Sequence, residues 1–229
     1  MIGRILCRFS PICEWAAPFT VRLFLHPQCP RSARQRPTVH LTRSARLCLP
    51  LLPLRRQTIE EKFGGLKGIR MAYLGDISNN MTYDLMRGGS LMGFTVAVAG
   101  PKGGEFEIED GVLEECDALA AVSGGGYQIC ATAAEAVAGA DIVYTDSWQS
   151  YGVTQTEERL AALMPFQVTE EVMAMAKPGA IFMNCLPAMR GEEQTAEVID
   201  GPQSVVFDQA ENRLHAQKAL LYLLITRQL

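Results

Sequence analysis

The chain has 229 residues, of which 48% are hydrophobic and 20% charged, as expected for a globular protein that can bury a sizeable core. No apolar run approaches the roughly 20 residues that a membrane-spanning helix needs, so a transmembrane role is excluded. The net charge of −4 gives no general support for nucleic-acid binding.

The charge is distributed very unevenly along the chain. Residues 1–59 contain ten arginines, no lysine and one acidic residue, a net charge of +9, so residues 60–229 carry the remaining −13. The same segment holds seven of the twelve prolines and four of the seven cysteines. This change of composition predicts two parts: an atypical Arg/Pro-rich segment over 1–56, either disordered or artefactual, and a folded domain over 57–229.

Three interpretations of the N-terminal segment stay open. An arginine-rich, acid-poor start is typical of organelle transit peptides, although its prolines would interrupt a long amphipathic helix. Positive charge alone would also suit a nucleic-acid arm, but the apolar runs 21–25 and 47–54 are unlike a solvated basic tail. The third interpretation, which we favour, is a shifted reading frame or wrong start.

The seven cysteines show neither CxxC spacing nor an accompanying histidine cluster. We therefore expect no metal site and no structural disulfide, and the cytoplasm is the expected compartment. Cys116, Cys130 and Cys185 lie in apolar sequence surroundings, where a buried free thiol is the usual state.

From Gly68 onward, short apolar runs alternate with helical stretches. The apolar runs predict strands at 69–74, 94–99, 141–145, 180–184 and 204–207. Helices are predicted at 80–92, 131–138, 157–163, 169–176 and 212–224, the fourth with Thr169 as N-cap. Gly124-Gly125-Gly126 lacks the GxGxxG pattern and is expected to be a flexible turn. This alternation predicts an α/β fold, a doubly wound parallel sheet with helices on both faces.

Polar residues concentrate where four of the predicted strands end, at 75–80, 146–152, 184–187 and 208–213. Ligands of parallel α/β sheets bind at the carboxyl ends of the strands. The four clusters therefore predict one ligand site at that edge.

Three residues in these clusters are candidates for chemistry. Asp146 can accept hydrogen bonds from an amine, or it can merely cap the next helix. Cys185 can orient an amine, although a cysteine at a strand end is more often a packed small side chain. Arg213 can hold a phosphate or carbonyl oxygen, or it can form a surface salt bridge. The residue before a proline avoids the helical region, so Leu186-Pro187 predicts an extended exit that leaves nearby carbonyl groups free.

Four segments in this order resemble ornithine carbamoyltransferase: Gly75-Asp-Ile-Ser-Asn-Asn80, Asp146-x-x-x-Ser150, Cys185-Leu-Pro187 and Val206-Phe-Asp-Gln-Ala-Glu-Asn-Arg213. The resemblance runs from about Gln57 to the C-terminus and implies a Rossmann-like ornithine-binding domain. It implies that Asn80 binds the amino-acid end of ornithine and that Asp146, Ser150 and Tyr151 grip ornithine. It also implies that Cys185 and Leu186 lie between the two substrates and that Arg213 reaches carbamoyl phosphate.

The implied reaction is attack of the ornithine side-chain amine on carbamoyl phosphate, giving citrulline and phosphate. Asp146 and Cys185 would orient the amine, and Arg213 would offset charge on the oxygens. The resemblance implies ornithine and carbamoyl phosphate as partners, no cofactor, and a homo-oligomer, a trimer in the family.

This chain departs from the family pattern in three places. Asn184 stands where the family usually has histidine, and Tyr151 replaces the methionine of Ser-Met-Gly. The acceptor amine therefore stays open, with a diamine or a modified ornithine as alternatives. The carbamoyl-phosphate motifs Ser-x-Arg-Thr-Arg and His-Pro-x-Gln are missing, and residues 47–56 occupy the place of the second. We therefore predict little or no transferase activity for this chain alone.

Three other interpretations compete with this one. A nicotinamide-dependent dehydrogenase would explain the run 177–181 before a strand, but not the missing GxGxxG. A truncated, non-catalytic domain that binds an amino acid or associates with other subunits is the second. Aspartate carbamoyltransferase shares the architecture, but Asp146-x-x-x-Ser150 together with Cys185-Leu-Pro187 favours ornithine.

Overall fold

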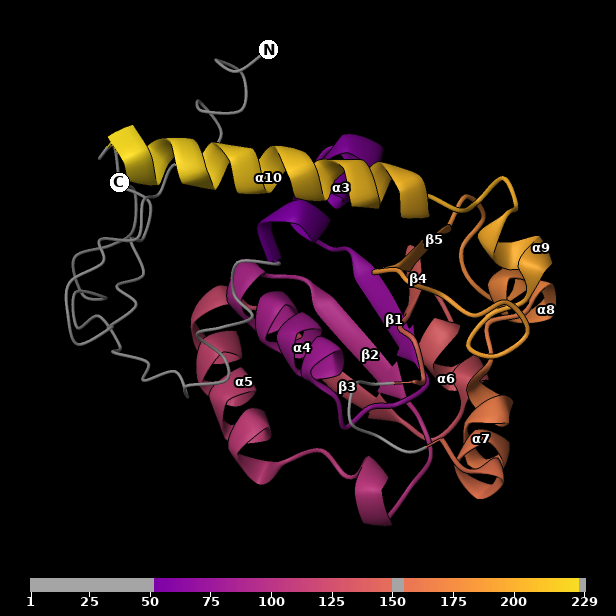
Figure 1. Ribbon diagram of the computed structural model, residues 1–229. Coiled ribbons are helices and arrows are strands. Elements are labelled where there is room, and N and C mark those ends of the chain that lie inside the picture. Colours follow the sequence, from indigo (N-terminus) through magenta and orange to yellow (C-terminus); the bar gives the residue numbers. More distant parts are fainter. Residues whose placement is uncertain (1–51, 150–154, 227–229) are drawn as a thin grey trace.

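The computed structural model describes residues 52–149 and 155–226 of the chain. Within these residues, five parallel strands form one sheet in the order β3-β2-β1-β4-β5 (Figure 1). The order reverses beside β1, which pairs with β2 on one side and β4 on the other. A reversal of this kind opens a crevice at the carboxyl edge of the sheet. The predicted doubly wound parallel sheet is confirmed.

The strands are short and apolar, and four of them match the predicted strands closely. Gly100-Pro101 follows one of them and Gly75 follows another, so the apolar runs are bounded by residues that end regular structure. The strands are β1 (Arg70–Leu74), β2 (Thr95–Ala99), β3 (Gly126–Cys130), β4 (Ile142–Thr145) and β5 (Ile181–Asn184).

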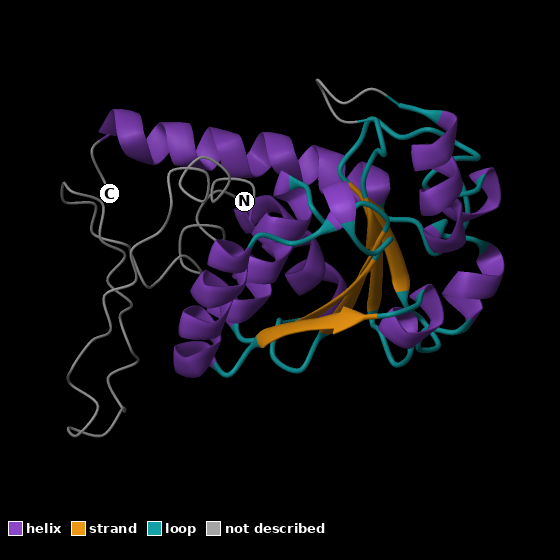
Figure 2. Cartoon of the chain, turned by 90° about the horizontal axis from the view of Figure 1, so that it is seen from below, coloured by secondary structure: helices purple, strands orange, loops and turns teal. Residues whose placement is uncertain are grey.

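Helices cover both faces of the sheet (Figures 1 and 2). On one face α4 and α5 pack together, and α3 packs against α10, which crosses in front of it in Figure 1. On the other face lie α6, α8 and α9. The helices are α3 (Leu52–Phe63), α4 (Asn80–Met92), α5 (Asp110–Ser123), α6 (Ala133–Val137), α7 (Glu157–Leu163), α8 (Glu170–Ala174), α9 (Ala196–Ile199) and α10 (Val206–Thr226), with 3-10 turns η3 (Gly104–Phe106) and η4 (Met164–Phe166).

Several helix starts follow directly from the sequence. The side chain of Asn79 accepts a hydrogen bond from the Thr82 amide and begins α4, and Thr156 caps α7 in the same way. The predicted cap at Thr169 is confirmed, because its side chain accepts from the Val172 amide at the start of α8.

The alternation of side chains along each strand builds two cores, one on each face of the sheet. Met71 and Tyr73 of β1 point into the core beneath α3, α4 and α5. Ala72 and Leu74 point into the core beneath α6 and α8. Both faces are buried, which explains why the strands read as continuous apolar runs rather than alternating ones.

Three helices, α3, α5 and α9, and one strand, β3, were not predicted. The predicted turn at Gly124-Gly125-Gly126 is present, but it joins α5 to β3 and is closely packed. Gly124 ends α5 in the left-handed conformation with φ of 76°, and Gly126 begins β3. A Cβ on Gly125 would lie 2.2 Å from the Gly89 carbonyl oxygen. The run is a tightly packed helix-to-strand turn, because glycine alone lets the two backbones approach this closely.

The predicted strand at 204–207 was wrong. Ser204 forms only an isolated parallel bridge with Phe182, and α10 begins at Val206. The carbonyl of Val205 already accepts a hydrogen bond from the Gln209 amide. The β-branched pair Val205-Val206 favours a strand locally, but only one residue pairs with the sheet before the helix starts. The polar cluster at 208–213 therefore lies in the first turns of a helix and not at a strand end.

The predicted boundary between residues 56 and 57 falls inside α3. Arg55, on its N-terminal side, is 3% exposed and packs on the domain. Among the described residues, no helix is long and apolar enough to cross a membrane.

Candidate functional site

Strand register brings two of the predicted site residues together. Thr145 of β4 pairs with Asn184 of β5, and both strands end there. The next residue of each strand is Asp146 and Cys185, so they lie side by side at the carboxyl edge of the sheet. The Cys185 Sγ donates a hydrogen bond of 2.7 Å to Asp146 Oδ1. The same oxygen accepts the Ser147 amide at 2.8 Å.

Burial controls the charge of this pair. Burial raises the pKa of Asp146, while hydrogen bonds from the Cys185 thiol and the Ser147 amide lower it in part. Burial and the negative charge of Asp146 both raise the pKa of Cys185 well above its ordinary value. The Cys185 thiol is therefore held in its neutral form and donates to Asp146, which makes the two side chains a polar pair suited to holding an amine.

A pocket of about 70 Å³ is lined by three predicted residues, Cys185, Leu186 and Arg213, whereas Asp146 is not among its lining residues. Arg213 projects from the second turn of α10, and the other two follow β5. Two charged or polar side chains that sequence reasoning missed, Arg55 and Gln209, complete the polar lining. Such a volume suits a small group of a few atoms, as at the reacting end of a larger ligand.

Arg55 and Gln209 converge on one buried hydroxyl group. The Arg55 Nε donates to the Tyr144 hydroxyl at 3.0 Å, and Gln209 Nε2 donates to it at 2.9 Å. Burial raises the pKa of Tyr144 to about 12, although Arg55 lowers it in part. Gln209 lies one helical turn before Arg213, so the spacing along α10 could have identified it. Nothing in the sequence near Arg55 points to Tyr144, which lies 89 positions away.

The predicted extended exit at Leu186-Pro187 was wrong. Leu186 has a φ of 53°, in the left-handed region, and the Leu186–Pro187 peptide is cis. The Leu186 amide donates to Asn184 Oδ1 at 2.8 Å, which closes a tight turn directly after β5. Asn184 also donates to Gln194 Oε1 at 3.0 Å and is 1% exposed. The asparagine thus supports the turn from inside the fold and does not line the 70 Å³ pocket.

Asn80 lies apart from this pocket in the structure. It is exposed, at the first residue of α4, and is not among the pocket's lining residues. Its neighbour Asn79 donates to the Tyr73 hydroxyl at 3.1 Å, and Tyr73 stacks on Tyr144 with ring centroids 6.2 Å apart. Ser150 and Tyr151, two further predicted site residues, lie outside the described part of the chain.

A buried arginine ties the loop that leads to Asn80 to α7. Arg159 Nη2 lies 2.6 Å from Asp76 Oδ2, and Nη1 lies 2.8 Å from Glu105 Oε1. The guanidinium group stacks 4.8 Å from the centroid of the Phe106 ring. The Ser78 hydroxyl donates to the Glu105 carbonyl and completes the connection. These contacts fix the residues that follow β1 against the start of α7.

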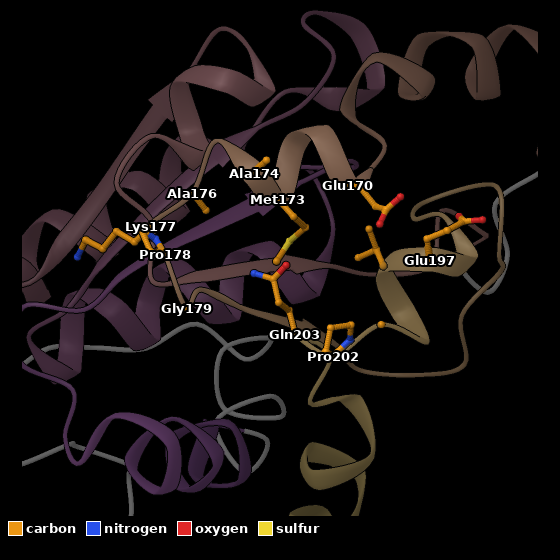
Figure 3. A pocket seen from close by; sticks show the side chains of 12 residues that line it. Glu170, Met173, Ala174, Ala176, Lys177, Pro178, Gly179, Glu197, Pro202 and Gln203 are labelled. Atoms are coloured by element: carbon orange, nitrogen blue, oxygen red, sulfur yellow. The ribbon is translucent and has the colours of Figure 1, made fainter.

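A larger pocket, of about 310 Å³, lies at the opposite edge of the sheet, between α8 and residues 197–203 (Figure 3). Two of its polar side chains have partners of their own: Gln203 donates to the Ala180 carbonyl, and Lys177 points away and pairs with Asp141. None of the predicted site residues lines it. The site therefore remains the carboxyl edge of the sheet.

The doubly wound sheet, with a small pocket at its carboxyl edge, has the architecture of a Rossmann-like domain. Comparison with known proteins identifies the family to which this domain belongs. The family model of the aspartate/ornithine carbamoyltransferase Asp/Orn binding domain matches residues 67–224, so the chain belongs to this family.

Ornithine carbamoyltransferase of Thermococcus kodakarensis is 49% identical over 170 residues, which are 74% of this chain and 53% of that protein. The enzyme of Bifidobacterium longum subsp. infantis is 50% identical over 169 residues, 72% of this chain and 52% of that protein. The solved structure of Giardia lamblia ornithine transcarbamoylase is 45% identical with a TM-score of 0.71, covering 76% of this chain and 58% of that one. The solved structure of Pyrococcus furiosus ornithine carbamoyltransferase is 46% identical in sequence, with a TM-score of 0.70, and the match covers 75% of this chain and 54% of that one.

The chain thus spans about half the length of the curated relatives that it matches. The matched half is the amino-acid-binding domain, and the predicted family resemblance is confirmed. Membership of this family decides against the dehydrogenase interpretation.

Proposed function

We propose that this domain binds ornithine at the Asp146–Cys185 pair and serves carbamoyl transfer to the ornithine side-chain amine. The observation that carries the proposal is the 2.7 Å hydrogen bond between Cys185 and Asp146, beside a pocket that Arg213 also lines. The relatives named above, which are ornithine carbamoyltransferases, support ornithine as the amino acid.

In this proposal Asp146 accepts a hydrogen bond from the amine and Cys185 lies next to it. An alkyl ammonium has a pKa of about 10.4, so the site must take up the neutral amine or accept its proton. The amine nitrogen then forms a bond to the carbamoyl carbon while the carbon–oxygen bond to phosphate breaks. Phosphate leaves with the electron pair and takes up the proton that the nitrogen loses, and Arg213 offsets charge on the carbonyl and phosphate oxygens.

We propose further that this chain alone has little or no transferase activity. The carbamoyl-phosphate motifs are missing from its sequence, and the matched region covers only about half of each relative. Without those groups the alignment of the two substrates, which supplies much of the rate, is lost. The departure at Tyr151 leaves a diamine or a modified ornithine as alternative acceptors.

Isothermal titration of the full chain with ornithine, with and without carbamoyl phosphate, tests both statements. Ornithine should bind, Asp146→Asn should abolish binding, and citrulline should not accumulate. Asp141→Asn is the matched control, because Asp141 precedes the same strand at the opposite edge of the sheet. Binding that survives Asp146→Asn would contradict the site, and ordinary turnover would contradict the predicted loss of activity. Titration with putrescine and N-acetylornithine would show which acceptor fits best.

A further inference from the structure

One buried side chain fixes the backbone on both sides of Cys185. Asn184 is the last residue of β5 and is 1% exposed. Its Oδ1 accepts the Leu186 amide at 2.8 Å, so the side chain closes a turn around Cys185 from within the fold. Asparagine suits this position, because its side chain readily binds the backbone amide two residues further along the chain. The orientation of Cys185 therefore depends on a residue that does not line the 70 Å³ pocket.

The turn places Leu186 in a backbone conformation that has to be held. Its φ of 53° lies in the left-handed region, which is costly for a residue with a Cβ and persists where surrounding contacts enforce it. The hydrogen bond from its amide to Asn184 is such a contact. Without that bond, Leu186 would relax toward a more favourable conformation, and the preceding residue, Cys185, would move with it.

A second buried amide, Gln194, holds Asn184 in place. Asn184 Nδ2 donates to Gln194 Oε1 at 3.0 Å. Gln194 is 0% exposed, and its Nε2 donates to the Met189 carbonyl at 3.1 Å. The two side chains form a continuous hydrogen-bond path from the end of β5 to the loop that follows it. Because both are buried, the loss of either partner leaves a polar atom of the other unsatisfied.

We propose that Asn184 and Gln194 are positioning residues for the site: Asn184 holds the Cys185 thiol against Asp146, and Gln194 holds Asn184. Cys185 Sγ lies 2.7 Å from Asp146 Oδ1, so a small rotation of the backbone at residue 185 would break that hydrogen bond. For its substrate this inference rests on the proposed function, since the Cys185–Asp146 pair is where we propose that ornithine binds. Asn184 thus supports the site from below and does not select the acceptor amine.

Alkylation by iodoacetamide, followed by peptide mass spectrometry, tests the positioning of Cys185 without any substrate. Asn184→Leu has a similar branched shape but removes both hydrogen bonds, so the thiol should leave Asp146 and react several-fold faster than in wild type. Burial and the charge of Asp146 raise the pKa of Cys185, so a thiol that leaves both is ionised to a greater extent. Asn184→Ser keeps an acceptor for the Leu186 amide and should restore a rate close to that of wild type.

Two controls separate positioning from a general loss of stability. Cys116 and Cys130 are buried elsewhere and should react at unchanged rates in every variant. Glu193→Met removes a different hydrogen bond of the same loop, because Glu193 is 0% exposed and its Oε1 accepts the Met189 amide at 2.6 Å. This variant should leave the rate at Cys185 unchanged. The proposal is overturned if Asn184→Leu does not change that rate, or if it accelerates all three cysteines equally.

A double substitution tests the contribution of Gln194. Gln194→Leu should also accelerate Cys185, and Asn184→Leu combined with Gln194→Leu should react no faster than Asn184→Leu alone, since the two residues act through one path. Rates that multiply would contradict this coupling. In titrations with ornithine, Asn184→Leu should weaken binding by about tenfold, whereas Glu193→Met should not. If the wild-type chain binds no ornithine, the proposed function fails, but the alkylation rates still decide whether Asn184 positions Cys185.

Discussion

Cys185 and Asp146 form a donor–acceptor pair in which each side chain sets the charge of the other. The thiol donates to the carboxylate at 2.7 Å, and the carboxylate raises the pKa of the thiol in addition to the effect of burial. A thiol in this state is a poor nucleophile and a suitable hydrogen-bond donor. The pair therefore favours a role in orienting a substrate amine over covalent catalysis.

The first prediction concerns the reactivity of Cys185. Asp146→Asn removes the negative charge, so the pKa of Cys185 should fall, although burial keeps it above the ordinary value. The thiolate fraction at pH 8 then rises, and alkylation of Cys185 by iodoacetamide should accelerate several-fold, as followed by peptide mass spectrometry. Cys130, which is buried elsewhere, is the internal control and should react at the same rate in both proteins. An unchanged or slower rate at Cys185 would show that Asp146 does not set its pKa.

The second prediction concerns stability. The pKa of Asp146 is raised in the folded protein, chiefly by burial, so the folded state binds this proton more tightly than the unfolded state. The free energy of unfolding therefore falls as the pH rises from the ordinary pKa through the raised one. Asp146→Asn keeps an acceptor oxygen without the charge and should stabilise the protein by about 1 kcal/mol at pH 7.

The pH dependence separates this explanation from improved packing. Well below the ordinary aspartate pKa of about 3.9, the carboxyl group is protonated in both the folded and the unfolded state, so wild type and Asp146→Asn should have nearly equal unfolding free energies. Urea denaturation at pH 7 and at progressively lower pH measures the difference. If Asp146→Asn raises the free energy of unfolding by the same amount at every pH, the stabilisation does not come from removing the buried charge.

A third prediction compares two buried ion pairs of similar geometry. Arg159–Asp76 measures 2.6 Å and Arg87–Glu115 measures 2.7 Å, and all four side chains are 10% exposed or less. Removing one partner of a buried pair costs about 3–5 kcal/mol, so Arg159→Met and Arg87→Met should destabilise the fold similarly. Only Arg159 holds the loop that leads to Asn80, so only Arg159→Met should also weaken ornithine binding, by about tenfold. Equal loss of affinity in both variants would indicate a general effect of stability.

Local patterns were sufficient for much of the fold. The predicted strands that became β1, β2, β4 and β5 agree with the structure to within one residue at each end, because glycine, proline and polar residues bound each apolar run. The strand predicted at 204–207 was wrong because β-branched residues indicate only a local preference for extended backbone. In the structure only Ser204 pairs with the sheet. Helix α5 and strand β3 were missed together, because the glycine run 124–126, whose last residue belongs to β3, predicts a flexible turn on its own.

The site was predictable only in part, because local sequence patterns do not show which distant residues come together. Cys185, Leu186 and Arg213 line one pocket, and their substrate roles stay predictions. Arg55 was assigned to a segment outside the fold because of the charge around it, yet its guanidinium group donates to the buried Tyr144 hydroxyl. Arg55 and Tyr144 are 89 positions apart, so neither the residues around Arg55 nor the periodicity of the sequence indicates that the two side chains are in contact.

The last prediction concerns the packing of the glycine turn at Gly125 against α4. A Cβ on Gly125 would lie 2.2 Å from the Gly89 carbonyl oxygen and 2.8 Å from the Gly93 Cα, both backbone atoms that have little freedom to move. Gly125→Ala must therefore separate α4 from the start of β3, at a cost of about 1–3 kcal/mol or more. Gly111→Ala is the matched control: Gly111 lies in α5, and its added Cβ would meet no atom within 4 Å. Because alanine is the better helix former, Gly111→Ala should stabilise the protein by about 0.5–1 kcal/mol. Urea denaturation of the two variants should thus give changes of opposite sign, and a Gly125→Ala variant as stable as wild type would show that α4 and the turn are not in close contact.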